Sequence, residues 1–296
     1  IRSHPEVDAW GGCGDWLALD GSGKTNGATP KDLIGTAFYA HDVKIMEQVA
    51  GLLGRKEDAA RFRSLLPQIL EAFRHRFVTP EGLLASGTQT AYVLALHFGL
   101  LPEELRPTAA RELVRDIEKR QYHIATGFVG TPYILDVLED NGFLDIAYRL
   151  LEQETFPSWL FPVKNGATTV WERWDGWTPE KGFQDKNMNS FNHYAYGAVG
   201  AWMYRSVAGL ELDVQDPGYR HIIFRPRPGG SITSAKAELQ TPQGPAGISW
   251  RIDGKTLVVE TSVPDGARAT FSPPPGYVSQ SAEWGAGHHR IVLSMA

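Results

Sequence analysis

The sequence has 296 residues, enough for one large domain or two ordinary ones with a sizeable core. With 42% hydrophobic and 21% charged residues it is neither disordered nor fibrous, and a net charge of -5 without basic runs argues against nucleic acid or an anionic membrane surface as a partner. The single cysteine, Cys13, excludes an internal disulfide and a cysteine-built zinc site. Residues 1–10 show neither a signal peptide nor a capped helix, and no apolar run approaches the roughly 20 residues that span a bilayer.

Residues 31–208 are predicted to form helices joined by short loops. Within residues 57–77 the apolar side chains recur at steps of three and four, which defines one helical face, and Gly54 is the expected left-handed residue after the preceding helix. Further helices are predicted over residues 105–121, 133–138, 144–151 and 191–208, the last being the longest regular case. Successive helices with short links are antiparallel neighbours, so this part is predicted to be a set of helical hairpins.

The pattern changes near Gly209. Residues 210–219 contain Gly, Pro and three acidic residues, which is typical of a linker. Beyond them Ile248, Trp250 and Ile252 alternate with polar residues, and Asp253-Gly254 is a hairpin signal before the next apolar run. Residues 221–225 and 231–239 are further strand candidates, and three prolines at 273–275 indicate a rigid surface loop. We therefore predict an all-helical domain over residues 1–209 and a small antiparallel β-domain over residues 210–296.

Residues 18–25, Ala-Leu-Asp-Gly-Ser-Gly-Lys-Thr, match the relaxed form of the phosphate-binding loop. That loop requires a helix beginning at its lysine, so that backbone N–H groups face the phosphates. Here Asn26, Gly27 and then Pro30 follow, and proline does not fit a helix interior. We therefore interpret the segment as a flexible turn ahead of the next helix and not as an ATPase motif.

The most informative segment is residues 167–177, in which Trp171, Trp174 and Trp177 lie three apart among charged residues. Indole faces stack on the apolar C–H faces of sugars, while carboxylates and guanidinium groups such as those of Glu172, Arg173 and Asp175 form hydrogen bonds with the sugar hydroxyl groups. The alternative is a hydrophobic plug with an ion pair from Arg173 to Asp175 or to Glu172. The segment alone favours neither interpretation.

Two further blocks favour the sugar site. Gly14-Asp15-Trp16-Leu17 places a carboxylate beside a tryptophan, and residues 189–197 place His193 among amides at the predicted start of the last helix. A histidine at a helix start is more often a capping residue, but the short polar connection allows His193 and Glu172 to reach the same end of a helical bundle. The other histidines, among them His4, have no ligand spacing, so no metal and no cofactor are expected.

Through these blocks, and through residues 221–226 in the β-domain, the sequence resembles the bacterial α-L-rhamnosidases of glycoside hydrolase family 78. The resemblance covers nearly the whole chain, in order. It implies a mainly α fold followed by β: a partial (α/α)6-toroid of helical hairpins plus a C-terminal antiparallel β-sandwich domain. It also implies inverting hydrolysis of terminal α-L-rhamnose from a rhamnosylated glycoside or oligosaccharide. The sequence leaves the compartment open between the bacterial cytoplasm and the periplasm.

The resemblance also implies roles for individual residues. Glu172 matches the general base that activates water, His193 matches a residue that contacts the sugar, and Trp16 matches an aromatic wall of the pocket. The other members of the two aromatic blocks are the remaining candidate substrate contacts: Trp171, Trp174, Trp177, Asp15, Arg173 and Asp175. An inverting enzyme needs two carboxyl groups roughly 6.5–9.5 Å apart, one for the water and one for the leaving oxygen.

The family's general-acid motif, of the Arg-Asp-Glu-Arg-Leu-Gly-Trp type, does not occur in residues 1–296. The chain is therefore expected to be the C-terminal part of a larger enzyme and to need an upstream segment or another polypeptide for the acid. Two alternatives remain open: a non-catalytic carbohydrate-binding protein, and an (α/α)-toroid glycosidase or lyase for another sugar.

Overall fold

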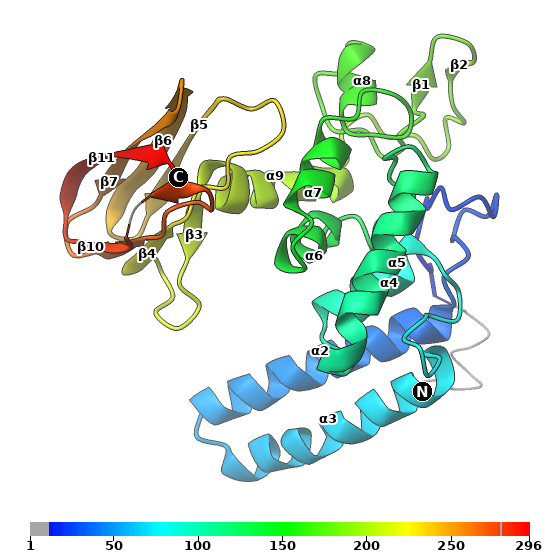
Figure 1. Ribbon diagram of the computed structural model, residues 1–296. Coiled ribbons are helices and arrows are strands. Elements are labelled where there is room, and N and C mark those ends of the chain that lie inside the picture. Colours follow the sequence, from blue (N-terminus) through cyan, green and yellow to red (C-terminus); the bar gives the residue numbers. More distant parts are fainter. Residues whose placement is uncertain (1–11, 279) are drawn as a thin grey trace. The chain divides into compact units, whose positions relative to one another are not determined.

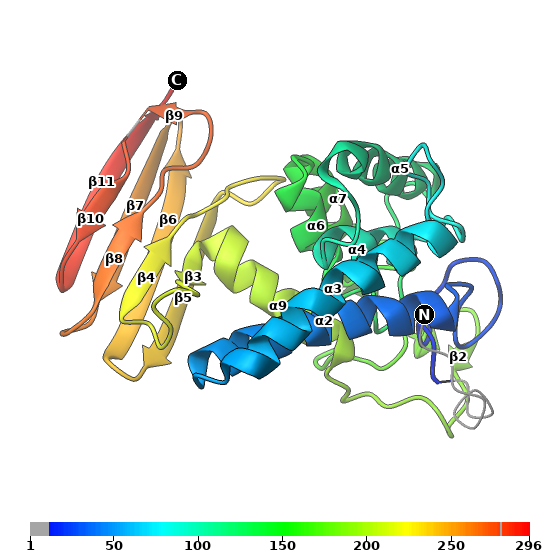
Figure 2. The same ribbon diagram turned by 90° about the horizontal axis from the view of Figure 1, so that it is seen from below.

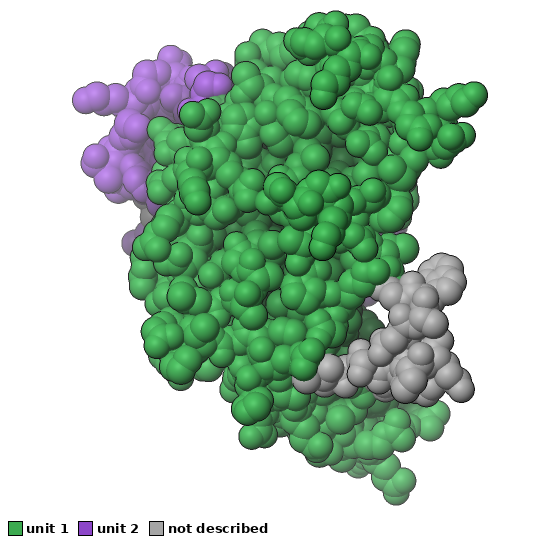
Figure 3. Space-filling view, turned by 90° about the vertical axis from the view of Figure 1, so that its right-hand side faces the viewer, with its two compact units in different colours: residues 1–198 green, residues 199–296 purple. Residues whose placement is uncertain are grey.

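The computed structural model describes residues 12–278 and 280–296; the expectations for residues 1–10, with His4, lie outside the described residues. Apart from two short strands, β1 (Trp177–Thr178) and β2 (Gly182–Phe183), the regular structure of the described chain is helical up to Ala208 and consists of β-strands after it (Figure 1). This division agrees with the prediction from the sequence. It contains two compact units, residues 1–198 and 199–296, which Figure 3 distinguishes by colour. In the part of the chain that is described, no helix combines the length and apolarity needed to cross a bilayer.

The longest helices, α2 (Lys31–Leu52) and α3 (Lys56–Phe77), form an antiparallel hairpin (Figures 1 and 2). Gly54 lies between them with φ +69°, a conformation that favours glycine, as predicted for a helix C-terminus. The predicted apolar face of α3 is confirmed, because Ile69, Phe73 and Phe77 are buried. Ion pairs between Arg76 and Asp32 (2.7 Å) and between Arg63 and Glu47 (2.7 Å) join the polar edges of the hairpin.

Two shorter hairpins follow: α4 (Gln89–His97) packs with α5 (Arg106–Lys119), and α6 (Ile134–Asp140) packs with α7 (Leu144–Leu151). The predicted helices at 105–121, 133–138 and 144–151 are confirmed with small shifts at their ends. Helix α4 is not predicted from the sequence because it has no polar face: every residue from Gln89 to Leu96 is buried. A short helix η1 (Glu103–Leu105) precedes α5, and α8 (Leu160–Lys164) follows α7.

The predicted long helix over 191–208 is wrong at its start and irregular in the rest. The chain forms a 3₁₀ turn η2 (Ala195–Ala198), an α turn α9 (Val199–Trp202) and a π-helical segment η3 (Met203–Ala208), and residues 191–194 are not helical. The backbone before residue 195 is used otherwise: the His193 N–H donates to the Val170 carbonyl at 2.9 Å, and the Thr169 hydroxyl donates to the Phe191 carbonyl. These bonds to a distant segment replace the first helical turn.

The second unit contains two sheets. One has the strand order β10-β8-β4-β3, and the other has the order β5-β6-β7-β11-β9. The strands are β3 (Leu210–Leu212), β4 (His221–Phe224), β5 (Ser234–Thr241), β6 (Gly244–Asp253), β7 (Thr256–Val263), β8 (Arg268–Phe271), β9 (Tyr277–Val278), β10 (Ala282–Trp284) and β11 (Gly287–Met295). The Trp284 ring stacks on Phe271 of its own sheet (centroids 5.1 Å apart) and on His289 of the other (4.9 Å). The unit is therefore a sandwich, as predicted (Figure 2).

Two details of the sandwich differ from the prediction. The predicted linker at 210–219 begins with strand β3, which pairs with β4 through Leu210 and Phe224. The β4–β8 pair is parallel, so the sandwich is not purely antiparallel. The predicted hairpin is confirmed: β6 and β7 pair through Asp253 and Thr256, and Gly254 adopts φ +58° between them.

A polar network ties the loop after β3 to the four-stranded sheet. The Asp213 carboxylate accepts hydrogen bonds from the Gln215 N–H (2.8 Å) and pairs with Nδ1 of His221 (2.7 Å). The other ring nitrogen of His221 lies 2.7 Å from the Thr270 hydroxyl, which in turn donates to Glu283. The Gln215 N–H and then the His221 ring hold the pKa of Asp213 below its usual value of 3.8.

This network predicts that the folded state loses stability at acid pH. A carboxyl group whose pKa is lower in the folded than in the unfolded state stabilises the folded state above the unfolded-state pKa. This contribution disappears as pH falls through the folded-state pKa. We expect the Tm of the wild type to fall between pH 5 and 3 more steeply than that of Asp213→Asn, measured by circular dichroism. The matched control Asp265→Asn, in an exposed turn, should follow the wild type. Equal acid slopes for Asp213→Asn and the wild type would contradict the assignment.

Candidate functional site

Glu172 lies where two loop segments of the chain are joined by hydrogen bonds. The Glu172 N–H donates to the Ser190 carbonyl (2.9 Å), and the Ser190 N–H returns a bond of 2.9 Å to Oε2 of the Glu172 side chain. The His193 N–H to Val170 bond extends the pairing. Among the described residues, no donor bonds to Oε1 of this half-buried side chain. One carboxylate oxygen is thus fixed by the backbone, and the other can accept a proton.

His193 lies at the end of this pairing, three residues after Ser190. Its Nδ1 accepts a hydrogen bond from the Ala195 N–H at 3.3 Å, which assigns the ring proton of the neutral tautomer to Nε2. One face of the ring stacks on Phe128 (centroids 5.0 Å apart, planes at 30°), and it also stacks with the exposed Tyr194 (5.3 Å, 9°). The half-buried ring is therefore fixed by Ala195 and Phe128, and its Nε2–H remains a hydrogen-bond donor.

The three tryptophans of the cluster have different surroundings. Trp171 is 8% exposed and packs edge-on against Phe191, while Trp174 is 3% exposed and stacks face to face on Tyr196, with centroids 3.8 Å apart. Trp177, in strand β1 (Trp177–Thr178), is half-buried. Burial raises the pKa of Tyr196 far above its usual value, with a further contribution from the Asp15 carboxylate, so the phenol stays neutral. Trp171 and Trp174 are therefore packing residues of this region.

The charged partners of the tryptophans bond to each other. Arg173 Nε lies 3.0 Å from Oδ1 of Asp175, which is one of the two ion pairs considered in the plug interpretation. Oδ2 of Asp175 accepts from the Gln184 amide at 2.9 Å, just after strand β2 (Gly182–Phe183). Oδ1 of Asp175 thus pairs with Arg173, and Oδ2 anchors the residue that follows the β1–β2 hairpin.

Asp15 is not placed as a polar sugar contact, which corrects the expectation. Its exposure is 0%, and its two oxygens accept four hydrogen bonds from the protein, from Thr90 and from the backbone of residues 127–130. The neighbouring Trp16 is half-buried, and its carbonyl accepts the Phe128 N–H at 3.0 Å. Phe128 therefore connects Trp16 to His193, and the structure brings these two residues and Glu172 into one region.

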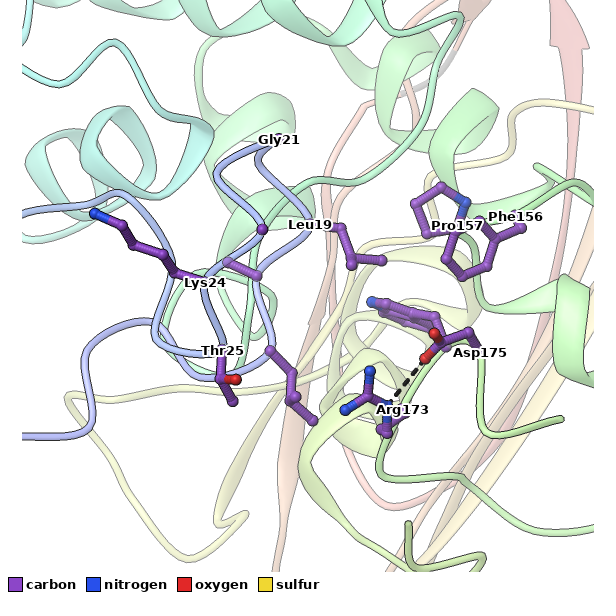
Figure 4. A pocket seen from close by; sticks show the side chains of 12 residues that line it. Leu19, Gly21, Lys24, Thr25, Phe156, Pro157, Arg173 and Asp175 are labelled. Carbon is purple, nitrogen blue, oxygen red and sulfur yellow. Dashed lines mark hydrogen bonds and ion pairs between the residues drawn. The ribbon is translucent and has the colours of Figure 1, made fainter. Parts of the chain in front are cut away.

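The Gly/Ser segment at 18–25 is a loop, as interpreted from the sequence, and the next helix begins only at Lys31. It borders a cavity of about 470 Å³, which Figure 4 shows with the Arg173–Asp175 pair on one side and Lys24 and Thr25 on the other. The lining residues are Leu17, Ala18, Leu19, Gly21, Gly23, Lys24, Thr25, Phe156, Pro157, Arg173, Trp174 and Asp175. Its apolar walls and few polar groups are typical of a small-molecule pocket.

A second depression, of about 370 Å³, lies beside the tryptophan segment at residues 167–177. Four aromatic residues border it: Trp171, Trp177, Phe183 and Phe191. Across residues 12–278 and 280–296, no group of three or more His, Cys, Asp or Glu residues is arranged to hold a metal ion. Neither the lining of this depression nor that of the larger cavity includes Glu172 or His193.

Comparison with known proteins identifies the family. Residues 4–207 match the bacterial alpha-L-rhamnosidase 6 hairpin glycosidase domain, and residues 209–285 match the bacterial alpha-L-rhamnosidase C-terminal domain. The chain belongs to the bacterial α-L-rhamnosidase family. The resemblance inferred from the sequence and the toroid-plus-sandwich fold class are confirmed.

Individual α-L-rhamnosidases align over most of this chain. An α-L-rhamnosidase of Streptomyces avermitilis is 46% identical over 87% of the chain, and one of Formosa agariphila is 41% identical over 88%. The structure of the Streptomyces avermitilis α-L-rhamnosidase complexed with L-rhamnose matches 95% of the chain with a TM-score of 0.87 and 42% identity. That of native α-L-rhamnosidase from Aspergillus terreus matches 95% with a TM-score of 0.89 and 32% identity.

This α-L-rhamnosidase-family chain is much shorter than its relatives. It covers 24% of the Streptomyces avermitilis relative and 28% of the Formosa agariphila relative, and 28% and 33% of the two solved structures. It thus spans about a quarter of the length of the curated relatives it matches. Phe128 and Thr90 are not among the candidates drawn from the sequence. Their local signal is the pair of glycines at 127 and 130, which allow close backbone approach.

Proposed function

We propose that this chain supplies the general-base side of an α-L-rhamnosidase active site, which removes terminal α-L-rhamnose from a glycoside or oligosaccharide with inversion. The observation that carries the proposal is the Glu172 carboxylate, held at Oε2 by the Ser190 N–H, with no donor among the described residues on Oε1. Family membership supports the sugar, since the relatives are α-L-rhamnosidases. We assign Glu172 as the base, with His193 and Trp16 as sugar contacts.

In this mechanism Glu172 Oε1 takes a proton from a water molecule as the water oxygen bonds to the anomeric carbon. The glycosidic C–O bond breaks on the opposite face, and a second carboxylic acid protonates the leaving oxygen. His193 Nε2–H donates to a sugar hydroxyl, and the Trp16 indole covers an apolar face of the ring.

We further propose that residues 1–209 are part of the catalytic toroid and residues 210–296 are the β-sandwich domain. The general-acid motif of the family is absent from residues 1–296, so the acid in this proposal comes from polypeptide outside these residues. Asp15 and Asp175 do not serve, because their oxygens already accept hydrogen bonds from the protein. The protein tested must therefore include that polypeptide.

The direct test is the stereochemistry of turnover. With an aryl α-L-rhamnoside, we expect release of the phenol and β-L-rhamnose as the first sugar product, because water attacks the face opposite the leaving group. Proton NMR of the anomeric signal, recorded before mutarotation, distinguishes β from α product. A first product in the α configuration would contradict an inverting base.

A parallel calorimetric titration with L-rhamnose separates the alternatives. Binding of L-rhamnose without turnover, even with the missing polypeptide supplied, would favour a carbohydrate-binding protein. Turnover of another glycoside in a substrate panel, without turnover of rhamnosides, would favour a toroid enzyme for a different sugar. Turnover of the rhamnoside alone supports the proposal.

A further inference from the structure

Asp15 is a charged side chain buried at the junction of two loops that are far apart in sequence. Oδ2 accepts the Thr90 hydroxyl and the Gly127 N–H (2.8 Å), and Oδ1 accepts the N–H groups of Val129 (2.9 Å) and Gly130 (3.4 Å). A carboxylate is costly to bury unless such bonds replace its water. Burial raises the pKa of Asp15, and these four hydrogen bonds act in the opposite direction.

The residues that flank these bonds are the candidate sugar contacts. Trp16 follows Asp15 directly, and its carbonyl accepts the Phe128 N–H. The Phe128 ring supports one face of His193 and packs edge-on against Tyr196 at 5.2 Å. The next residue, Leu17, has φ +60°, which is uncommon for a non-glycine residue and marks a sharply defined turn. One carboxylate therefore holds both the Trp16 turn and the loop that supports His193.

We propose that Asp15 is a positioning residue for the sugar site: it fixes the Trp16 turn against residues 127–130 and, through Phe128, sets the orientation of His193. The inference rests on the proposed function, because Trp16 and His193 are sugar contacts only in that assignment. Asp15 itself touches no substrate. It acts by aligning an aromatic wall and a hydrogen-bond donor that come from segments far apart in the sequence.

The test is Asp15→Asn in the protein that turns over an aryl α-L-rhamnoside. The asparagine NH₂ group must face at least one N–H donor of residues 127–130, so the two loops separate. Because the sugar contacts shift and the base does not, we expect KM to rise about 10-fold or more while kcat stays within about threefold. A merely structural role would lower the folded fraction, which reduces the apparent kcat and leaves KM unchanged.

Asp20→Asn is the matched control. Asp20 lies in the same loop and also accepts two backbone N–H bonds, but its donors, Ser22 and Ala28, belong to that loop and not to residues 127–130. It should keep the wild-type KM. Hydrogen exchange read by mass spectrometry should be faster at residues 127–130 in Asp15→Asn only. If Asp15→Asn does not fold, Thr90→Val removes one donor at constant shape and should raise KM in the same direction by a smaller factor.

The outcomes separate the two proposals. Wild-type turnover together with an unchanged KM in Asp15→Asn, or in Thr90→Val if that variant replaces it, would overturn the positioning role and leave the rhamnosidase assignment intact. Unchanged exchange at residues 127–130 would overturn it as well. A wild-type protein that neither binds L-rhamnose nor hydrolyses rhamnosides would overturn the proposed function, and the role of Asp15 with it.

Discussion

Replacing Glu172 with glutamine should reduce kcat on an aryl α-L-rhamnoside by about 10²–10⁴-fold, the usual contribution of a general base. The amide keeps the shape of the side chain, and its oxygen can still accept the Ser190 N–H, so the pairing of the two segments survives. The amide cannot take a proton from water at neutral pH. Steady-state kinetics should therefore show the loss in kcat, while calorimetry shows L-rhamnose affinity close to that of the wild type.

Glu180→Gln is the matched control for this loss. Glu180 is exposed in the turn of the β1–β2 hairpin, eight positions from Glu172, and the same chemical change there should leave kcat unchanged. Near-normal turnover by Glu172→Gln would remove the base assignment. A loss of rhamnose affinity as large as the loss of kcat would instead show that Glu172 binds the sugar in the ground state.

Gly127→Ala should destabilise the helical unit, because Gly127 has the shortest distance from an added Cβ to a neighbouring atom among the glycines described in that unit. A Cβ at Gly127 would lie 2.2 Å from the Trp16 carbonyl oxygen, 2.7 Å from the Asp15 carbonyl oxygen and 2.8 Å from the Ala18 nitrogen. All three are backbone atoms, so no rotamer change relieves the overlap and the loops must separate. We expect a loss of about 1–3 kcal/mol in the free energy of unfolding and weaker L-rhamnose binding.

Gly35→Ala provides the control of opposite sign. Gly35 is exposed within α2, and a Cβ there meets no atom within 4 Å. Alanine in a helix should raise the free energy of unfolding by about 0.4–1 kcal/mol and leave sugar binding unchanged. Urea unfolding followed by circular dichroism measures both variants. A Gly127→Ala protein as stable as the wild type would show that the two loops are not closely apposed.

The parts of the fold that the sequence predicts are those in which one face is apolar and the other polar. Helices α3 and α5 and the β6–β7 hairpin have this contrast, and their positions are confirmed. Helix α4 is buried on all sides and so has no periodicity to detect. The error at residues 191–194 has a different cause, since a helical pattern there is overridden by hydrogen bonds to residues 169 and 170. The local sequence pattern does not indicate hydrogen bonds to residues that are distant in the chain.

The residues of the candidate site also differ in how far the sequence indicates them. The sequence blocks place Trp16, Glu172 and His193 as candidates, and these remain predictions. Side chains that act through other side chains leave little local signal: Phe128 is an ordinary aromatic residue until the structure places it against His193. Asp15 illustrates the converse, because a carboxylate beside a tryptophan suggests a ligand contact, yet burial assigns it to the protein interior.

The bonds from Asp15 to residues 127–130 join positions 112 to 115 apart in the chain, and four α-helices, α2 to α5, lie between them. Closing so long a loop in the unfolded chain costs conformational entropy, and this cost is smaller once the helices within the loop have packed. The Trp16 turn and the His193 support are therefore expected among the last contacts to form during folding. A refolding intermediate with these helices in place, but without this closure, would have helical structure before it gains any affinity for sugar.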